Sequence, residues 1–336
     1  MSKIDGLVKS LNKQFKKDIV TKGGEIPERT FIPFSSPSLN YLSRGGVCEG
    51  KLIEFYGKEG SAKTTLALDI IKNFQELYPE RSVVYLDAEN TLNQDWATKL
   101  GVNMDEVLVI KPENECGEVL LDMVDATITS GEVGLVIIDS IPFITTKQEF
   151  ENDLDKKTYG GNSAVITTWC RKVIPLMNKY NVTVICINQP RAVIGSMYPT
   201  TDTPGGKMLK HSYVQRFEMR KHKYFDEKGV ELNNNAETPQ GHTVQVKLEK
   251  NKVTKNDRKV STFTLNYTTG IDVLKDTVDL AVYLGIISQS GAWFSFMYNE
   301  EEYKYQGRSR LVDDLKNNNE LLEFIKSEVA EHCLQQ

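Results

Sequence analysis

Apolar and polar positions follow two periods along residues 52–188, and together they predict strands that alternate with helices. The apolar runs expected to form strands are residues 52–56, 82–87, 107–110, 134–140 and 182–188. Apolar residues recur at helical spacing in residues 66–74, 119–128 and 164–180, which predicts helices. This order is typical of an α/β fold, in which helices cover both faces of a mostly parallel sheet.

The pattern changes after residue 212. Alternation in residues 214–220, 243–249 and 261–267 predicts antiparallel strands added to the parallel ones. The polar residues 224–241 are expected to form a hairpin loop between two of these strands. From about residue 272, a helical stretch, an apolar run at residues 291–298 and a second helical stretch interrupted by asparagines predict a small α+β domain.

The N-terminal stretch carries its own signal. Ile4, Leu7, Leu11 and Phe15 recur at helical spacing among lysines, which predicts a short amphipathic helix followed by a linker. Two interpretations remain open: the helix packs on its own domain, or it is an arm that packs on a neighbouring subunit. The expected domains are residues 1–30 (helix and linker), 31–270 (a large core) and 271–336 (the small domain).

Composition excludes several classes of protein. The chain has 336 residues and a formal net charge of −5, and this mild charge does not exclude nucleic-acid binding, which depends on a local basic patch. Its five cysteines form no Cys-x-x-Cys pair, which argues against a zinc site and fits a reducing cytoplasm. We find no signal peptide and no apolar run of about 18 residues, so we expect a cytoplasmic protein without a membrane partner.

The loop between the first strand and the following helix carries the strongest motif. It comprises Gly57, Lys58, Glu59, Gly60, Ser61, Ala62, Lys63, Thr64 and Thr65. Strand, glycine-containing loop, Lys-Thr and helix together indicate a P-loop, whose backbone N–H groups and helix N-terminus bind a polyphosphate. Lys63 is then expected to reach the β- and γ-phosphates, and the Thr64 hydroxyl to hold magnesium.

One position departs from the usual P-loop pattern. Ala62 stands where a second glycine is expected. Only a negative φ would accommodate its Cβ without strain, so we expect that conformation.

Polar residues end three of the predicted strands. Glu89, Asp139 and Gln189 follow apolar runs, and ligands of such sheets bind beyond the carboxyl ends of the strands. Asp139 is interpreted as a magnesium-binding acid, Glu89 as the general base for an attacking water, and Gln189 as a sensor of the γ-phosphate. The alternative is that each merely caps its strand.

Two stretches, residues 150–162 and 190–206, do not fit the sheet pattern, and both leave strand ends near the predicted nucleotide. The second contains Arg191, Met197 and Tyr198, a combination of a cation, an apolar wedge and an aromatic ring that suits single-stranded nucleic acid. A lid over the nucleotide is the alternative. Taken alone, residues 250–252 are as consistent with an ordinary basic turn as with a functional segment.

These residues, taken in order, resemble the bacterial RecA-type recombinases over nearly the whole chain, in a version divergent enough to suggest a phage-encoded member. The resemblance rests on residues 57–65, 86–89, 136–140, 187–189 with Arg191, Gly205 and Gly206 with Leu209 and Lys210, residues 250–252, and residues 291–293. It implies a RecA-type ATPase core with an N-terminal polymerisation helix and a small C-terminal domain.

The resemblance also assigns roles. Asn93 and Trp96 match residues that meet adenine, Tyr267 and Gly270 match a segment that closes over a neighbour's nucleotide, and Lys250 and Lys252 match a pair that reaches a neighbour's γ-phosphate. The positions implied to bind DNA are Tyr159, Gly160, Arg191, Ile194, Gly195, Met197, Tyr198, Gly205, Gly206, Lys207 and Lys210.

The implied function is a DNA-dependent ATPase that polymerises on single-stranded DNA and catalyses strand exchange. It would use ATP and Mg2+, with the metal on Thr64 and Asp139, and its implied partners are single- and double-stranded DNA, further copies of itself, and single-strand-binding or mediator proteins. A hexameric helicase and a non-catalytic, ATP-gated DNA-binding filament protein are the alternatives. Glu89 favours an enzyme over the latter.

Overall fold

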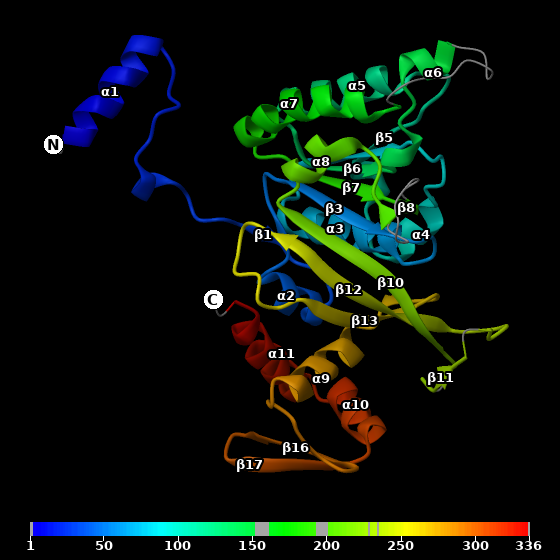
Figure 1. Cartoon of the computed structure of the whole chain (residues 1–336). Helices are drawn as coiled ribbons and strands as arrows, with labels where there is room; N and C mark the ends of the chain where they lie inside the picture. The colour runs from blue at the N-terminus through cyan, green and yellow to red at the C-terminus, as the bar shows by residue number, and fades with distance from the viewer. Residues whose placement is uncertain (1–2, 152–160, 193–200, 228, 234, 335–336) are drawn as a thin grey trace. The chain divides into compact units, whose positions relative to one another are not determined.

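The computed structural model describes residues 3–151, 161–192, 201–227, 229–233 and 235–334. The described residues form two compact units, residues 1–30 and 31–336 (Figure 1). In the first unit, helix α1 (Lys3–Phe15) confirms the predicted amphipathic helix and is followed by a short 3₁₀ turn, Gly23–Glu25. The side chains of Ile4, Leu7 and Phe15 are exposed, and that of Leu11 is partly buried.

The second unit is built on a sheet that has ten strands within the described residues, ordered β14-β13-β12-β10-β3-β7-β6-β4-β5 with β11 beside β10. The strands are β3 (Leu52–Gly57), β4 (Ser82–Asp87), β5 (Val107–Ile110), β6 (Val133–Asp139), β7 (Thr183–Asn188), β10 (Gln215–Phe225), β11 (Glu231–Leu232), β12 (Gly241–Asn251), β13 (Val260–Asn266) and β14 (Gly270–Ile271). Strands β10, β3, β7, β6, β4 and β5 run parallel, whereas β12, β13 and β14 join antiparallel. The predicted fold class is confirmed.

Helices cover both faces of this sheet (Figure 1). They are α3 (Lys63–Leu77), α4 (Gln94–Lys99), α5 (Gly117–Ser130), α7 (Ser163–Tyr180) and α8 (Gly206–Ser212). The short helix α6 (Lys147–Glu151), which buries no residue, and 3₁₀ turns at Met104–Glu106 and Ile141–Phe143 lie in the connections. Successive strand residues enter opposite cores: Val83 and Tyr85 pack with residues of α3, and Val84 and Leu86 with residues of α5 and α7. Burial on both faces is why these strands read as continuous apolar runs.

Short elements precede the first long strand and flank the second of the two predicted loops. They are β1 (Phe31–Ile32), α2 (Pro37–Ser43), β2 (Val47–Cys48), β8 (Arg191–Ala192) and β9 (Thr201–Asp202). The side chain of Ser36 caps the N-terminus of α2 by accepting a hydrogen bond from the Leu39 N–H. The four strands among them are not visible in the hydrophobic pattern, because two-residue strands are too short to show a period.

The C-terminal part contains α9 (Val273–Tyr283), β15 (Ser288–Ser290), β16 (Trp293–Tyr298), β17 (Glu301–Gln306), α10 (Arg308–Asn317) and α11 (Asn319–Leu334). The break predicted among the asparagines is confirmed, since Asn318 has an extended backbone. Strand β17 was not predicted, because its start is acidic and it pairs only at the edge of a small sheet. In the described part of the chain, no helix has the length and apolar character needed to cross a membrane.

The hairpin predicted for residues 224–241 is corrected in part. Strand β10 continues to Phe225, and β11 pairs back onto it through Tyr224 and Phe225. Backbone hydrogen bonding therefore extends into a stretch whose polar composition indicated a loop.

Candidate nucleotide site and DNA-loop exit

The P-loop joins the end of β3 to the start of α3, as predicted. A Cβ at Gly57 would lie 2.1 Å from the Met219 carbonyl oxygen, so only glycine fits there. The Lys58 carbonyl oxygen accepts hydrogen bonds from the Ser61 hydroxyl at 2.7 Å and from Lys63 Nζ at 2.9 Å. These two hydrogen bonds hold the loop closed around the Lys58 carbonyl group. Burial lowers the pKa of the Lys63 side chain.

Ala62 adopts a left-handed conformation, with φ of 69° and ψ of 22°. The expectation of a negative φ was therefore wrong. The left-handed region costs a residue with a Cβ about 1–2 kcal/mol. The turn into α3 requires this backbone, and the half-buried methyl group packs against the core beneath α3.

A cavity of about 240 Å³ lies at the carboxyl ends of the central strands. It is lined by residues 59–65 together with Glu89, Thr91, Asp139, Ile187 and Gln189. The tertiary structure thus brings together the P-loop and the three polar strand ends that the sequence singled out. Because backbone donors, a lysine and carboxylates converge there, this cavity is the candidate nucleotide site.

Asp139 ends β6 at the floor of this cavity and is 2% exposed. Its Oδ2 accepts hydrogen bonds from the Thr64 hydroxyl at 2.8 Å and from the Tyr85 hydroxyl at 2.7 Å. Burial raises the pKa of Asp139, and the two hydrogen bonds oppose that shift. A hydroxyl beside a carboxylate is a donor set that suits magnesium.

Glu89 lies beside Asp139, since its backbone N–H donates to the Asp139 carbonyl oxygen at 3.1 Å. Partial burial and, next, the Asp139 carboxylate raise the pKa of Glu89. Asp87 anchors this turn, because its carboxylate accepts from the backbone N–H groups of Thr91 and Leu92, each at 3.0 Å. Glu89 is thus a partly exposed carboxylate on a rigid turn, as a base acting on water needs to be.

Other predicted nucleotide contacts do not line the cavity. Trp96 is half-buried on α4, and Asn93 caps that helix by accepting from the Trp96 N–H at 2.9 Å. Tyr267 and Gly270 lie around the turn between β13 and β14, three strands or more from β3 in the sheet order. The Tyr267 hydroxyl is hydrogen-bonded with His242 Nδ1 at 2.8 Å.

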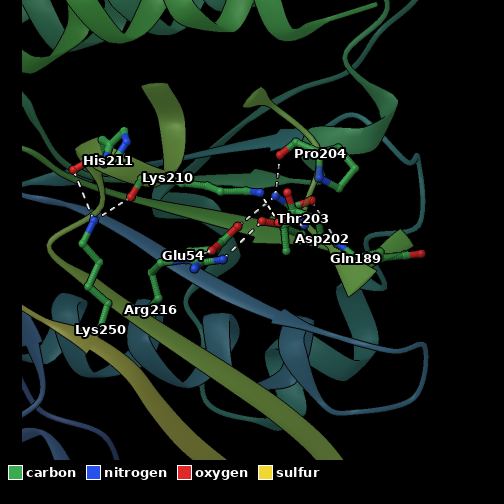
Figure 2. Close-up of polar contacts among 10 residues, drawn as sticks. Glu54, Gln189, Asp202, Thr203, Pro204, Lys210, His211, Arg216 and Lys250 are labelled. Carbon is green, nitrogen blue, oxygen red and sulfur yellow. Dashed lines mark hydrogen bonds and ion pairs between the residues drawn. The ribbon is translucent and has the colours of Figure 1, made fainter. Parts of the chain in front are cut away.

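Lys250, near the end of β12, and Lys252, just after that strand, lie at the end of the sheet opposite the P-loop. In the strand register, Lys250 pairs with Arg216, which pairs with Glu54 near the start of β3. Lys250 Nζ donates to the carbonyl oxygens of Lys210 at 2.6 Å and His211 at 3.2 Å, and Figure 2 shows both bonds. Lys252 Nζ also donates to the His211 carbonyl oxygen, at 3.1 Å. Burial, with Lys252 nearby, lowers the pKa of Lys250 to about 8.

The second predicted DNA loop has described residues only at its two ends. Arg191 in β8 pairs with Asp202 in β9, so the ends run antiparallel beside Gln189. Gly205 and Gly206 both have positive φ, 99° and 83°, where the chain turns into α8. The DNA contacts expected at Tyr159, Gly160, Ile194, Gly195, Met197 and Tyr198 lie outside the described residues. Lys207 is exposed, whereas Lys210 forms an ion pair with Asp202.

Sequence reasoning missed four residues of this region: Glu54, Tyr85, Asp87 and Arg216. Glu54 and Tyr85 interrupt apolar runs, and a buried polar group needs a hydrogen-bond partner. That interruption was a usable signal for their importance. It does not identify the partners, which come from other strands.

Two known protein-domain families match nearly the whole chain. The family described as RecA N-terminal domain matches residues 2–272, and that described as RecA C-terminal domain matches residues 275–334. Protein RecA of Caulobacter sp. (strain K31) is 35% identical over 330 residues, 97% of this chain and 88% of that protein. Protein RecA of Bacillus licheniformis is 34% identical over 333 residues, 98% of this chain and 91% of that protein.

Proposed function

The chain belongs to the RecA family, and from that premise we propose that it polymerises on single-stranded DNA and catalyses homologous pairing and strand exchange. Its role as a DNA-dependent ATPase in recombination and repair follows from the family. The observation that carries the proposal is that both family domains match in order over nearly the whole chain. In this proposal residues 1–30 serve polymerisation, 31–270 hydrolysis and DNA binding, and 271–336 form a separate small domain.

We assign nucleotide binding to the P-loop cavity. Residues 57–65 bind the phosphates through backbone N–H groups, with Lys63 on the β- and γ-phosphates. Thr64 and Asp139 fit a magnesium ion (Mg2+), which when bound neutralises charge on the phosphates. Glu89 orients and deprotonates the attacking water, a role supported by its position beside Asp139.

Hydrolysis is proposed to occur between subunits. Lys250 and Lys252 lie at the far end of the sheet from their own P-loop, so each reaches a γ-phosphate only on a neighbouring copy. Tyr267 and Gly270, which do not line their own cavity, would close over the same neighbouring nucleotide. A cation supplied in trans to the transferring phosphoryl group is worth about 10³–10⁵ in rate.

Gln189 is proposed to pass the state of the γ-phosphate to the second DNA loop. Gln189 lines the cavity, and Arg191 begins β8 two residues later. Arg191, Gly205, Gly206, Lys207 and Lys210 are the described residues of the proposed DNA surface. Single-strand-binding or mediator proteins are proposed as accessory partners.

Assembly and strand exchange test the proposed function directly. Negative-stain images with ATP and single-stranded DNA should show a helical filament, and a labelled strand should be exchanged between homologous DNAs. Closed six-membered rings with strand-separating activity would instead support the helicase alternative. Assembly without any ATP hydrolysis would support the non-catalytic filament protein.

A mixing experiment tests the shared site. Lys63→Ala and the double variant Lys250→Ala/Lys252→Ala should each be inactive as ATPases. In a mixed filament, a Lys63→Ala subunit lends its lysine pair to the sound P-loop of its neighbour, so hydrolysis should return with a maximum near equal proportions. If the two variants co-assemble on DNA and no activity returns at any ratio, the site is not shared in this way.

A further inference from the structure

A buried ion pair and one further hydrogen bond connect three neighbouring strands at the middle of the sheet. Glu54, in the otherwise apolar strand β3, is 0% exposed. Its carboxylate accepts hydrogen bonds from Arg216 Nε, on the neighbouring strand β10, and from Asn188 Nδ2 at 2.9 Å, on the other neighbour, β7. The guanidinium of Arg216 also lies 4.8 Å from the centre of the Tyr56 ring. Glu54 thus connects the P-loop strand to the strands on both sides of it.

Both partners of Glu54 also hold the end of the second loop. Arg216 Nη2 donates to the Thr203 hydroxyl at 3.2 Å, and Asn188 Nδ2 donates to the Pro204 carbonyl oxygen at 3.1 Å. Thr203 is 6% exposed, although it follows an exposed two-residue strand. In Figure 2 the side chain of Arg216 lies between Glu54 and Thr203, and that of Lys210 reaches the adjacent Asp202. We name Asp202, Thr203 and Pro204 the loop exit.

Stability alone does not account for this arrangement. Burial raises the pKa of Glu54, whereas Arg216 and the hydrogen bonds favour its ionised form. A buried ion pair must recover the cost of removing both charges from water, and apolar side chains of similar volume often stabilise a core as well or better. The network of Glu54, Arg216 and Asn188 instead fixes the position of the loop exit, because its hydrogen bonds connect that segment to strands β10 and β7.

Strands β3 and β7, which carry Glu54 and Asn188, lead directly to the candidate nucleotide site. Three residues after Glu54, β3 ends at Gly57 and the P-loop begins, and Gln189 directly follows Asn188. A shift of the loop exit therefore changes hydrogen bonds to the strands that carry the P-loop and Gln189. A ligand at the nucleotide site or at the second loop that prefers one arrangement of these hydrogen bonds then changes the affinity of the other site for its ligand.

We propose that Glu54, together with Arg216, is a positioning residue that couples nucleotide binding to the affinity of the second loop for DNA. This inference rests on the proposed function, in which residues 190–206 bind DNA. Thr203 is the contact through which the ion pair acts on the loop. Linkage requires the coupling to be reciprocal, so nucleotide raises DNA affinity by the factor by which DNA raises nucleotide affinity.

The test measures this coupling factor in the full-length protein. It is the Kd for a fluorescent single-stranded oligonucleotide without nucleotide, divided by the Kd with a non-hydrolysable ATP analogue. Couplings of this kind are about 5–150-fold. Glu54→Gln and Thr203→Val should each lower the factor at least fivefold or to near one, because each removes a link while nearly preserving shape. Thr203→Ser keeps the hydroxyl and should retain the parent value.

Two controls separate coupling from a general loss of stability. Asp125→Asn alters another buried carboxylate, which accepts a hydrogen bond from Trp169 Nε1 at 2.9 Å away from the loop exit, and should leave the factor unchanged. Circular dichroism and thermal melting check that every variant is folded. Glu54→Gln leaves the Arg216 guanidinium without its counter-charge and could fail to fold for that reason. Thr203→Val keeps the ion pair, so its coupling factor tests the proposal in that case.

The outcomes are distinct. A folded Thr203→Val with a coupling factor within twofold of the parent overturns the proposal, as does a folded Glu54→Gln with that property. A lower melting temperature with unchanged coupling means that the network is structural. A parent that binds DNA equally with and without nucleotide has no coupling, and this also overturns the proposal. If the parent does not bind single-stranded DNA at all, the proposed function fails instead.

Discussion

Replacing Asp276 with asparagine should remove a pH-dependent cost of folding. Asp276 lies in α9, is 2% exposed, and accepts hydrogen bonds from the Ser36 hydroxyl and, at 3.1 Å, from the Ser38 N–H at the start of α2. Burial raises its pKa from 3.8 to about 6, against the opposing effect of these hydrogen bonds. The folded protein therefore favours the protonated carboxyl group, because burial penalises the charge more than the two hydrogen bonds stabilise it.

The sign and size follow from linkage. A folded-state pKa above the unfolded value contributes stability that is complete below pH 3.8 and is lost as the pH rises through about 6. The two values differ by about 2 pH units, and each unit corresponds to about 1.4 kcal/mol. The full effect is therefore about 3 kcal/mol, of which about 1.4 kcal/mol falls between pH 5 and pH 8.

The assay is urea unfolding of the parent and Asp276→Asn at pH 5, 6, 7 and 8. An asparagine oxygen can accept the same two hydrogen bonds, so the variant should gain about 1.4 kcal/mol in free energy of unfolding relative to the parent across this range. Ser36→Ala, which removes one donor, should move the transition to higher pH. A difference between parent and Asp276→Asn that stays constant from pH 5 to pH 8 would refute the reasoning.

Two further predictions concern the candidate nucleotide site. Glu89→Gln should keep ATP and DNA binding and lower hydrolysis about 10²–10⁴-fold, because it removes a general base and preserves shape; steady-state hydrolysis within twofold of the parent would remove Glu89 from that role. Tyr85→Phe removes a hydrogen bond to a carboxylate, typically worth about 1.5–3 kcal/mol, so Asp139 should be less well oriented and Mn²⁺ binding, followed by electron paramagnetic resonance, should weaken. Unchanged Mn²⁺ affinity in Tyr85→Phe would mean that Thr64 alone orients Asp139.

The fold class and the core of the site could be predicted because their signals are local. Each central strand is buried on both faces, so it reads as an apolar run, and each helix between strands shows its own period. The carboxyl ends of parallel strands meet at one edge of the sheet. Glu89, Asp139 and Gln189 could therefore be placed beside Lys63 without knowing any contact between them.

The strand order and the partners of buried polar groups were decided only by the tertiary structure. Glu54 and Arg216 are 162 positions apart, and Tyr85 and Asp139 are 54 apart. No period in the sequence connects such residues. The edge strand β17 was missed because it begins with two acidic residues, which its pairing with β16 alone tolerates but which no apolar pattern in the sequence would predict as a strand.

Ala62 shows the same limit at a single residue. Its side chain by itself favours a negative φ, yet the turn between β3 and α3 holds it at 69°. The preference of one residue is worth about 1–2 kcal/mol, which is small against the packing of a buried strand on one side and a buried helix on the other. The sequence by itself therefore determined which chemistry lies at this edge of the sheet, while tertiary packing decided the backbone conformation and the hydrogen-bond partners that orient it, because those depend on contacts between distant segments.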